Sequence, residues 1–159
     1  MRFALRDFRQ QKDFPLRTKL LQVIALFLWA PFGLAQNNLG EVLDAGGKVL
    51  SAEEFRRAVV QRVITGPMPS GGSLEVVYLT NGAIQGVGRH PLLSFSQPNA
   101  QIRGQWTIDD KERVCTSMWI GDTPLPARCQ VWFKYDEQYF LSDSDSDRSM
   151  RVLRRTVKQ

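Results

Sequence analysis

The second half of the chain consists of short segments in which apolar and polar residues alternate, separated by turn-forming residues. A period of two is typical of β-strands that present one face to a core. With an earlier pair of such segments, the pattern predicts about seven strands. They cover residues 74–80, 83–88, 102–108, 113–120, 128–135, 139–142 and 150–157.

The links between these segments are short, which favours an antiparallel meander. Asn81-Gly82 between the first two segments is a strong signal for a tight hairpin turn. Strands joined in this way predict a strongly curved sheet or a small barrel in a mainly β (α+β) fold. Trp119 lies on the same face as Cys115, and Trp132 lies on the opposite face from Cys129. The alternation therefore leaves open which face is the core.

A single amphipathic helix is predicted before the strands. Ser51 and Glu54 have the spacing of a capping box. The apolar residues Ala52, Phe55, Val59 and Val63 then recur on one helical face. We expect about three turns that end at Gly66-Pro67 and pack across one opening of the barrel.

The N-terminal 35 residues have the pattern of a signal peptide. Residues 20–35 carry no charge, follow a basic segment and end in Gly33-Leu34-Ala35. This apolar run is shorter than the roughly 20 residues of a bilayer-spanning helix. We therefore predict cleavage after Ala35, a linker at 36–49 and a single β-rich domain at 50–159. The alternative is an uncleaved inner-membrane anchor through residues 20–35.

The net charge of +5 belongs mainly to this leader. Residues 1–35 hold six Lys/Arg and two Asp, so the remaining 15 basic and 14 acidic residues leave +1. A nearly neutral domain gives no reason to expect a nucleic-acid partner. One local cationic strip remains, at Arg151, Arg154 and Arg155. It either protects a closing edge strand from unwanted pairing or attracts an anionic membrane surface or cell-wall polymer.

The two cysteines, Cys115 and Cys129, are separated by 13 residues. In an oxidising compartment outside the cytoplasm, two cysteines most often form one structural disulfide. Closing a loop of this size stabilises a fold by about 3 kcal/mol. The rival interpretation is a redox or metal-binding pair, but the spacing is not Cys-x-x-Cys and no second ligand pair is present. We predict the disulfide, and neither a metal nor a cofactor.

Several short motifs follow one another in a fixed order: Leu50-Ser51-x-Glu53-Glu54, Asn81-Gly82-x-x-x-Gly86, Gly104-x-Trp106-x-Ile108-Asp109, Cys115 with Trp119, and Cys129. This order resembles a family of exported bacterial proteins that is catalogued as a domain of unknown function. The resemblance covers about residues 50–142, and the proline-bearing loop between the cysteines departs from it. It implies a small secreted β-rich domain and carries over no catalytic residue.

No catalytic constellation is recognisable. His90 is the only histidine, and no Gly-x-Ser-x-Gly or Ser-x-x-Lys motif occurs. Residues 143–147 begin like a calcium loop, but Arg148 replaces the glycine that such a loop needs, which favours a polar turn. The carboxylates near Asp109 are likewise interpreted as part of a turn.

These observations predict a non-enzymatic periplasmic or secreted domain that binds a partner at the cell envelope. The partner is not identified by the sequence. The alternative is a small-ligand-binding barrel whose concave sheet is lined by Trp106, Trp119, Trp132 and Tyr139. An envelope hydrolase is the third hypothesis, and it would depend on His90.

Overall fold

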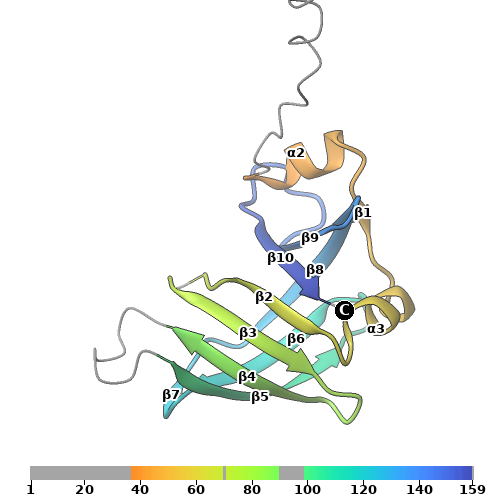
Figure 1. The fold of residues 1–159 in the computed structure, drawn as a ribbon. Coiled ribbons are helices and arrows are strands. Elements are labelled where there is room, and N and C mark those ends of the chain that lie inside the picture. The colour runs from red at the N-terminus through yellow and green to blue at the C-terminus, as the bar shows by residue number, and fades with distance from the viewer. Residues whose placement is uncertain (1–36, 70, 90–98, 159) are drawn as a thin grey trace, which may run out of the picture. The chain divides into compact units, whose positions relative to one another are not determined.

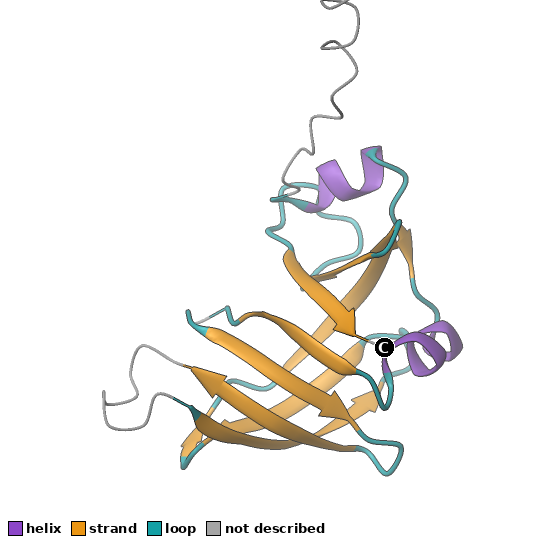
Figure 2. Ribbon diagram, in the orientation of Figure 1, coloured by secondary structure: helices purple, strands orange, loops and turns teal. Residues whose placement is uncertain are grey.

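The computed structural model describes residues 37–69, 71–89 and 99–158. It confirms the mainly β fold: eight antiparallel strands close into a barrel, and two helices accompany them (Figures 1 and 2). The leader and His90 lie outside the described residues. The helices are α2 (Leu39–Asp44) and α3 (Ala52–Val59). The strands are β1 (Lys48–Val49), β2 (Val63–Pro67), β3 (Ser73–Tyr78), β4 (Ala83–Arg89), β5 (Ala100–Ile108), β6 (Val114–Ile120), β7 (Thr123–Pro124), β8 (Arg128–Tyr135), β9 (Gln138–Ser142) and β10 (Leu153–Lys158).

The barrel is an antiparallel ring in the order β8, β9, β10, β2, β3, β4, β5, β6 and back to β8. The closing pair, β6 with β8, is short, because only Val114, Cys115 and Thr116 have partners on β8. Two short strands extend the ring at its margins: β1 pairs with β8, and β7 pairs with β6. The seven expected strands are all present, and β2 supplies the eighth strand of the barrel.

The helix predicted to end at Gly66-Pro67 is shorter than expected. Its capping box is formed, with the Glu54 amide donating to Ser51 Oγ and the Ser51 amide donating to Glu54 Oε2. The helix nevertheless ends at Val59, because Val60 is extended and Gln61 has a φ of 62°. Val63, expected on the helix, begins β2 instead. Its β-branched neighbours Ile64 and Thr65 favour a strand over a fourth helical turn.

The helix α3 closes one end of the barrel with Phe55. Its ring lies 5.8, 5.5 and 5.1 Å, centroid to centroid, from Tyr78, Trp106 and Trp132, each in an edge-to-face arrangement. This geometry is favourable for aromatic pairs. The interior of the barrel is therefore the face that carries Trp132, and the two cysteines lie on the outer face, where they are half-buried.

The segment predicted as a linker at 36–49 is part of the fold. Its helix α2 buries Leu39 and Val42 completely, against outward-facing residues of β8 and β9, among them Phe133 and Phe140, and against Val152. The strand β8 is consequently buried on both faces, since Trp132 points inward. The described residues 37–49, predicted as a linker, are thus packed into the same folded unit as the strands, N-terminal to the predicted boundary at residue 50. Among the described residues, neither helix has the length and apolar character needed to cross a bilayer.

Candidate ligand cavity

A cavity of about 130 Å³ lies toward the end of the barrel opposite α3. Its walls are mostly apolar, with a few polar groups. The apolar lining residues are Met68, Pro69, Leu74, Met118, Leu125, Pro126 and Leu141, and the polar ones are Tyr78, Thr116, Arg128, Gln130 and Arg155. Apolar walls with a small number of oriented polar groups are typical of small-molecule sites.

Two connections contribute to this end of the barrel. Met68 and Pro69 directly follow β2, and Leu125 and Pro126 precede β8. The second connection is held at both ends, because Cys115 on β6 is bonded to Cys129 on β8 and the Leu125 amide donates to the Met118 carbonyl at 2.8 Å. The proline-bearing loop between the two cysteines therefore forms part of the cavity wall.

Arg155 is the buried charged residue of the cavity. Leu153 and Arg155 both point inward from β10, and Arg155 is only 5% exposed. Its Nη1 donates to the backbone oxygens of Pro67 and Arg154, at 2.7 and 3.0 Å. Burial lowers the pKa of Arg155, because the charged form loses hydration, and the nearby Tyr78 side chain partly offsets this effect. The pKa of Tyr78 is raised by its own burial.

Arg155 lines the cavity and has further donors that no described residue engages. The hydrogen bonds of its side chain within the described chain use Nη1 alone. In the same residues, no buried side-chain nitrogen or oxygen is both sealed from solvent and without a partner. Nε and Nη2 are therefore accessible, and the described residues provide no carboxylate within ion-pair distance of them.

The neighbouring strand β2 has a glycine, Gly66, at the position where the Arg155 side chain crosses it. A Cβ atom placed on Gly66 of β2 would lie 2.6 Å from Arg155 Nη1 and 2.6 Å from the Arg154 carbonyl oxygen. Real Cβ atoms do not approach other atoms so closely. A side chain at residue 66 would consequently displace the guanidinium group.

The four aromatic residues predicted to line a concave face do not share one surface. Trp106, Trp132 and Tyr139 lie in the barrel interior and are buried at 8%, 2% and 8% exposure. They pack against one another and Phe55 as a core, and Trp106 Nε1 donates to the Leu79 carbonyl at 2.9 Å. Trp119 points outward and is 37% exposed. None of the four lines the cavity near Arg155, so the ligand face predicted from them is not formed.

The predicted basic strip is also divided by the structure. Arg151 and Arg154 are exposed, whereas Arg155 points into the barrel. The strand that carries Arg154 and Arg155 is not an edge strand, because β10 pairs with both β9 and β2. A three-arginine surface patch on an edge is therefore excluded.

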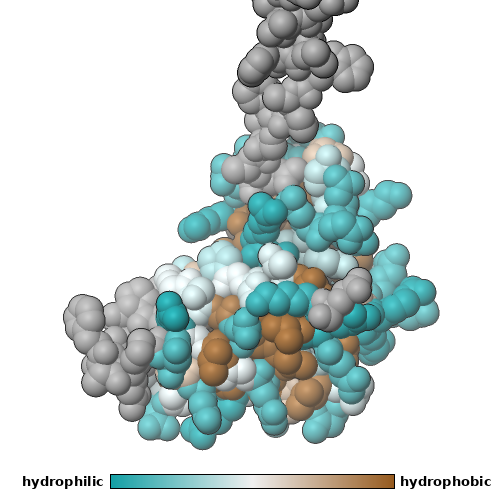
Figure 3. Space-filling view, in the orientation of Figure 1, coloured by the Kyte–Doolittle hydropathy of each residue, from teal (hydrophilic) through white to brown (hydrophobic). Residues whose placement is uncertain are grey.

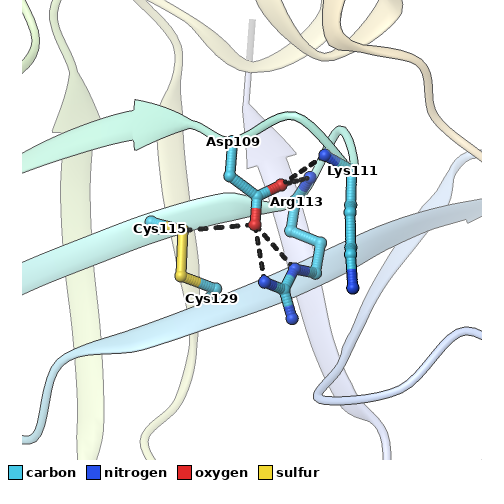
Figure 4. Close-up of a disulfide and its surroundings, with 5 residues drawn as sticks. All are labelled: Asp109, Lys111, Arg113, Cys115 and Cys129. Carbon is cyan, nitrogen blue, oxygen red and sulfur yellow. Dashed lines mark hydrogen bonds and ion pairs between the residues drawn. A yellow bond between two sulfur atoms is a disulfide. The ribbon is translucent and has the colours of Figure 1, made fainter.

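The predicted Cys115–Cys129 disulfide is formed, with an S–S distance of 2.02 Å (Figure 4). Asp109 lies beside it, and its Oδ2 accepts from both Nε and Nη2 of Arg113 at 2.7 Å. Its Oδ1 accepts from the backbone amides of Lys111 and Arg113. The side chain of Arg113, followed by these amides, holds the pKa of Asp109 below its usual range.

Asp109 and the two sulfur atoms are close enough together to suggest a metal-binding group, with their ligand atoms within 4.8 Å. Because the sulfurs are bonded to each other, they are not thiolate ligands. A more open hollow of about 330 Å³ lies beside the disulfide. It lacks a buried charged group, so we regard the cavity near Arg155 as the stronger site.

The segment that begins like a calcium loop is organised as a turn. Asp143 accepts from Arg128 Nη1 at 3.0 Å and from Gln130 Nε2 at 2.8 Å. The Ser144 hydroxyl accepts from the amides of Ser146 and Asp147. Asp143 is therefore engaged with the cavity wall, since Arg128 and Gln130 both line it.

The outer surface carries both apolar and polar side chains. On the face seen in Figure 3, apolar side chains gather over β2, β3 and β4 among hydrophilic residues. Val87 on β4 is 43% exposed. Scattered apolar residues of this kind are common on globular proteins and do not define a binding surface.

The fold and the cavity together define the structural class of this protein. It is a small closed antiparallel β-barrel with a partly apolar cavity. No protein-family model matches the sequence, and comparisons with curated proteins and with solved structures give no significant match.

Proposed function

We propose that this protein is an exported, non-enzymatic binding protein that holds a small molecule in its barrel. The observation that carries the proposal is the cavity between β3, β6, β8 and β10, whose apolar walls surround a few polar groups. Such a site can orient a ligand through hydrogen bonds and gain affinity from burial of apolar surface.

The volume limits the size of the ligand. Pockets for drug-sized molecules have volumes of roughly 300 to 1,000 Å³, and this cavity measures about 130 Å³. An engineered cavity of about 150 Å³ in another protein binds benzene. We therefore expect a ligand, or a ligand end group, of about the size of a benzene derivative.

Export is supported by two features. Residues 1–35 have the sequence pattern from which we predict a secretory leader, and the protein contains a disulfide, a bond that forms and persists in oxidising compartments. We place the protein in the periplasm or outside the cell, where the ligand would be encountered at the envelope.

A thermal-shift screen of the mature protein tests ligand binding. The probes are benzoate, benzamide, hexanoate, hexanamide and indole. A ligand that binds only the folded state raises the unfolding temperature, so we expect at least one probe to do so. No shift with any probe would count against the proposal.

A matched pair of variants locates the binding. Leu125→Trp adds a large side chain to the cavity wall, whereas Val87→Trp makes a comparable change at the exposed residue on β4. We expect the first variant to lose the ligand-induced shift and the second to retain it. Equal shifts in both variants would place the ligand elsewhere.

A further inference from the structure

We infer that the ligand is a small organic monoanion, namely a carboxylate on a short apolar body, which accepts hydrogen bonds from Nε and Nη2 of Arg155. This inference rests on the proposed function and specifies the ligand class of the same cavity.

The first step is the uncompensated charge. A guanidinium remains protonated in proteins, and burying a charge is costly unless an opposite charge or several hydrogen bonds compensate for it. Arg155 is 5% exposed, yet the described residues supply two backbone oxygens and no carboxylate. A bound anion would provide the missing partner.

The second step is geometry. The two backbone bonds hold Nη1 of Arg155 against Pro67 and Arg154. They leave Nε and Nη2 accessible, and these two atoms form one edge of the planar guanidinium. This edge matches the two oxygens of a carboxylate, so both can be bound in parallel. Because the group is already held in place, little side-chain entropy is lost on binding.

The third step is the number of charges. Arg128 and Arg155 are the charged residues that line the cavity. Arg128 is paired with Asp143 at 3.0 Å, which leaves one uncompensated positive charge. A ligand with one negative charge neutralises it, whereas a dianion would bury an excess negative charge.

The fourth step is the rest of the cavity. Leu74, Met118 and Leu141 present apolar surface to the same cavity. Burial of the ligand's hydrocarbon part against these side chains would contribute to affinity. An inorganic anion such as chloride would satisfy the charge but would leave this surface without a partner.

The decisive experiment compares acids with their neutral isosteres on the wild-type mature protein. Isothermal titration calorimetry in low-chloride buffer near pH 7 would use benzoate against benzamide and hexanoate against hexanamide. Because charge-assisted bonds are roughly twice as strong as neutral ones, we expect the acid of at least one pair to bind tighter by about tenfold or more. Equal or tighter binding of the amides would overturn the inference and leave the proposed function standing. No binding by either series would contradict both.

Variants on one strand identify the group responsible. Arg155→Met removes the buried charge, and Arg154→Met removes an exposed charge at the adjacent residue. Circular dichroism in the near-ultraviolet would report whether the aromatic core remains packed. In a folded Arg155→Met protein we expect the preference for the acid to disappear, and in Arg154→Met we expect it to persist. Retention of the preference without Arg155 would overturn the inference. If Arg155→Met does not fold, the wild-type comparison decides the question.

Discussion

At the scale of single residues, the positions of Arg155 and Gly66 depend on each other. Arg155 passes across β2 at the position where Gly66 has no side chain. Its guanidinium there bonds two backbone oxygens from β2 and β10. A buried charge held in this way contributes little to the stability of the fold, because an apolar side chain of similar volume often stabilises a core equally well or better. An arginine at this position is therefore better explained by a role in binding than by a structural role alone.

Asp109 offers a prediction about pH. Its hydrogen bonds with Arg113 and Lys111 are stronger to the ionised carboxylate, and they lower its pKa in the folded protein. The unfolded value for Asp is about 3.9. Stability from this group is therefore present above about pH 3.9 and is lost as the pH falls through the lower folded-state pKa. We expect Asp109→Asn to be destabilised at neutral pH and to lose less further stability on acidification than the wild type.

The measurement is the free energy of unfolding in urea, determined at a series of pH values from about 7 down to 3. Asp110→Asn is the matched control, because it changes an exposed aspartate in the same turn. If the free energy of unfolding of the two variants depended on pH in the same way, the hydrogen bonds of Asp109 would not be the cause of the stability lost at low pH.

At the scale of elements, the seam between β6 and β8 closes the barrel with few backbone contacts. Three residue pairs join these strands, and the disulfide is the middle one. The β3–β4 pair has six such pairs. We expect the Cys115→Ala/Cys129→Ala double variant to lose about 3 kcal/mol of stability, with the loss of order concentrated at the seam.

Hydrogen exchange of backbone amides measures this directly. Protection should fall more in β6 and β8 than in β3 and β4, which serve as an internal control within the same molecule. A uniform loss across all four strands would indicate that the disulfide stabilises the whole fold and does not specifically hold the seam.

Local signals predicted several elements correctly because the relevant interactions are close in sequence. Ser51 and Glu54 form the expected capping box, and Asn81-Gly82 joins β3 to β4. The helix length was wrong because Val63 continues the apolar period of α3, although tertiary pairing places it in β2. The β-branched run Val63-Ile64-Thr65 was the signal that favoured a strand.

The cavity could not be predicted in the same way, because its residues come from distant strands. Tyr78 and Gln130 reach it through barrel closure, which no local pattern specifies. For Arg155 a signal did exist, since Leu153 and Val157 flank it at intervals of two and indicate an inward position. An arginine at such a position is read as exposed by default, because charged residues are rarely buried.

At the scale of the whole molecule, the helix α2 was not predicted, and its segment was interpreted as a linker, because a six-residue helix carries little periodicity of its own. The helix α2 is stabilised by what it covers, namely the outward apolar residues Val131, Phe133 and Phe140. Those residues explain why both faces of the paired strands are partly apolar in the sequence. The folded unit is therefore a barrel with one helix at an end and another on its side (Figure 1).

This arrangement sharpens the expectation for the leader. The Asn37 amide donates to Glu41 Oε2 at 2.7 Å, and the Asn37 carbonyl accepts from the Val152 amide at 3.2 Å. Processing C-terminal to Leu39 would remove part of α2 and expose the side chains it covers. Cleavage after Ala35 would leave these contacts intact, so we expect protein recovered from outside the cytoplasm to comprise residues 36–159 with no free thiol. Intact mass measurement before and after thiol alkylation checks both points.

Two variants of the leader provide the control. Signal peptidases require small residues near the cleavage site, so Ala35→Arg should block processing and retain the full-length chain at the membrane, whereas Ala35→Ser should be processed normally. Recovery of the wild-type protein uncleaved in the membrane fraction would instead support the anchor at residues 20–35. An N-terminus beyond Leu39 would contradict the role of α2 as a cover for β8, because the fold would then persist without it.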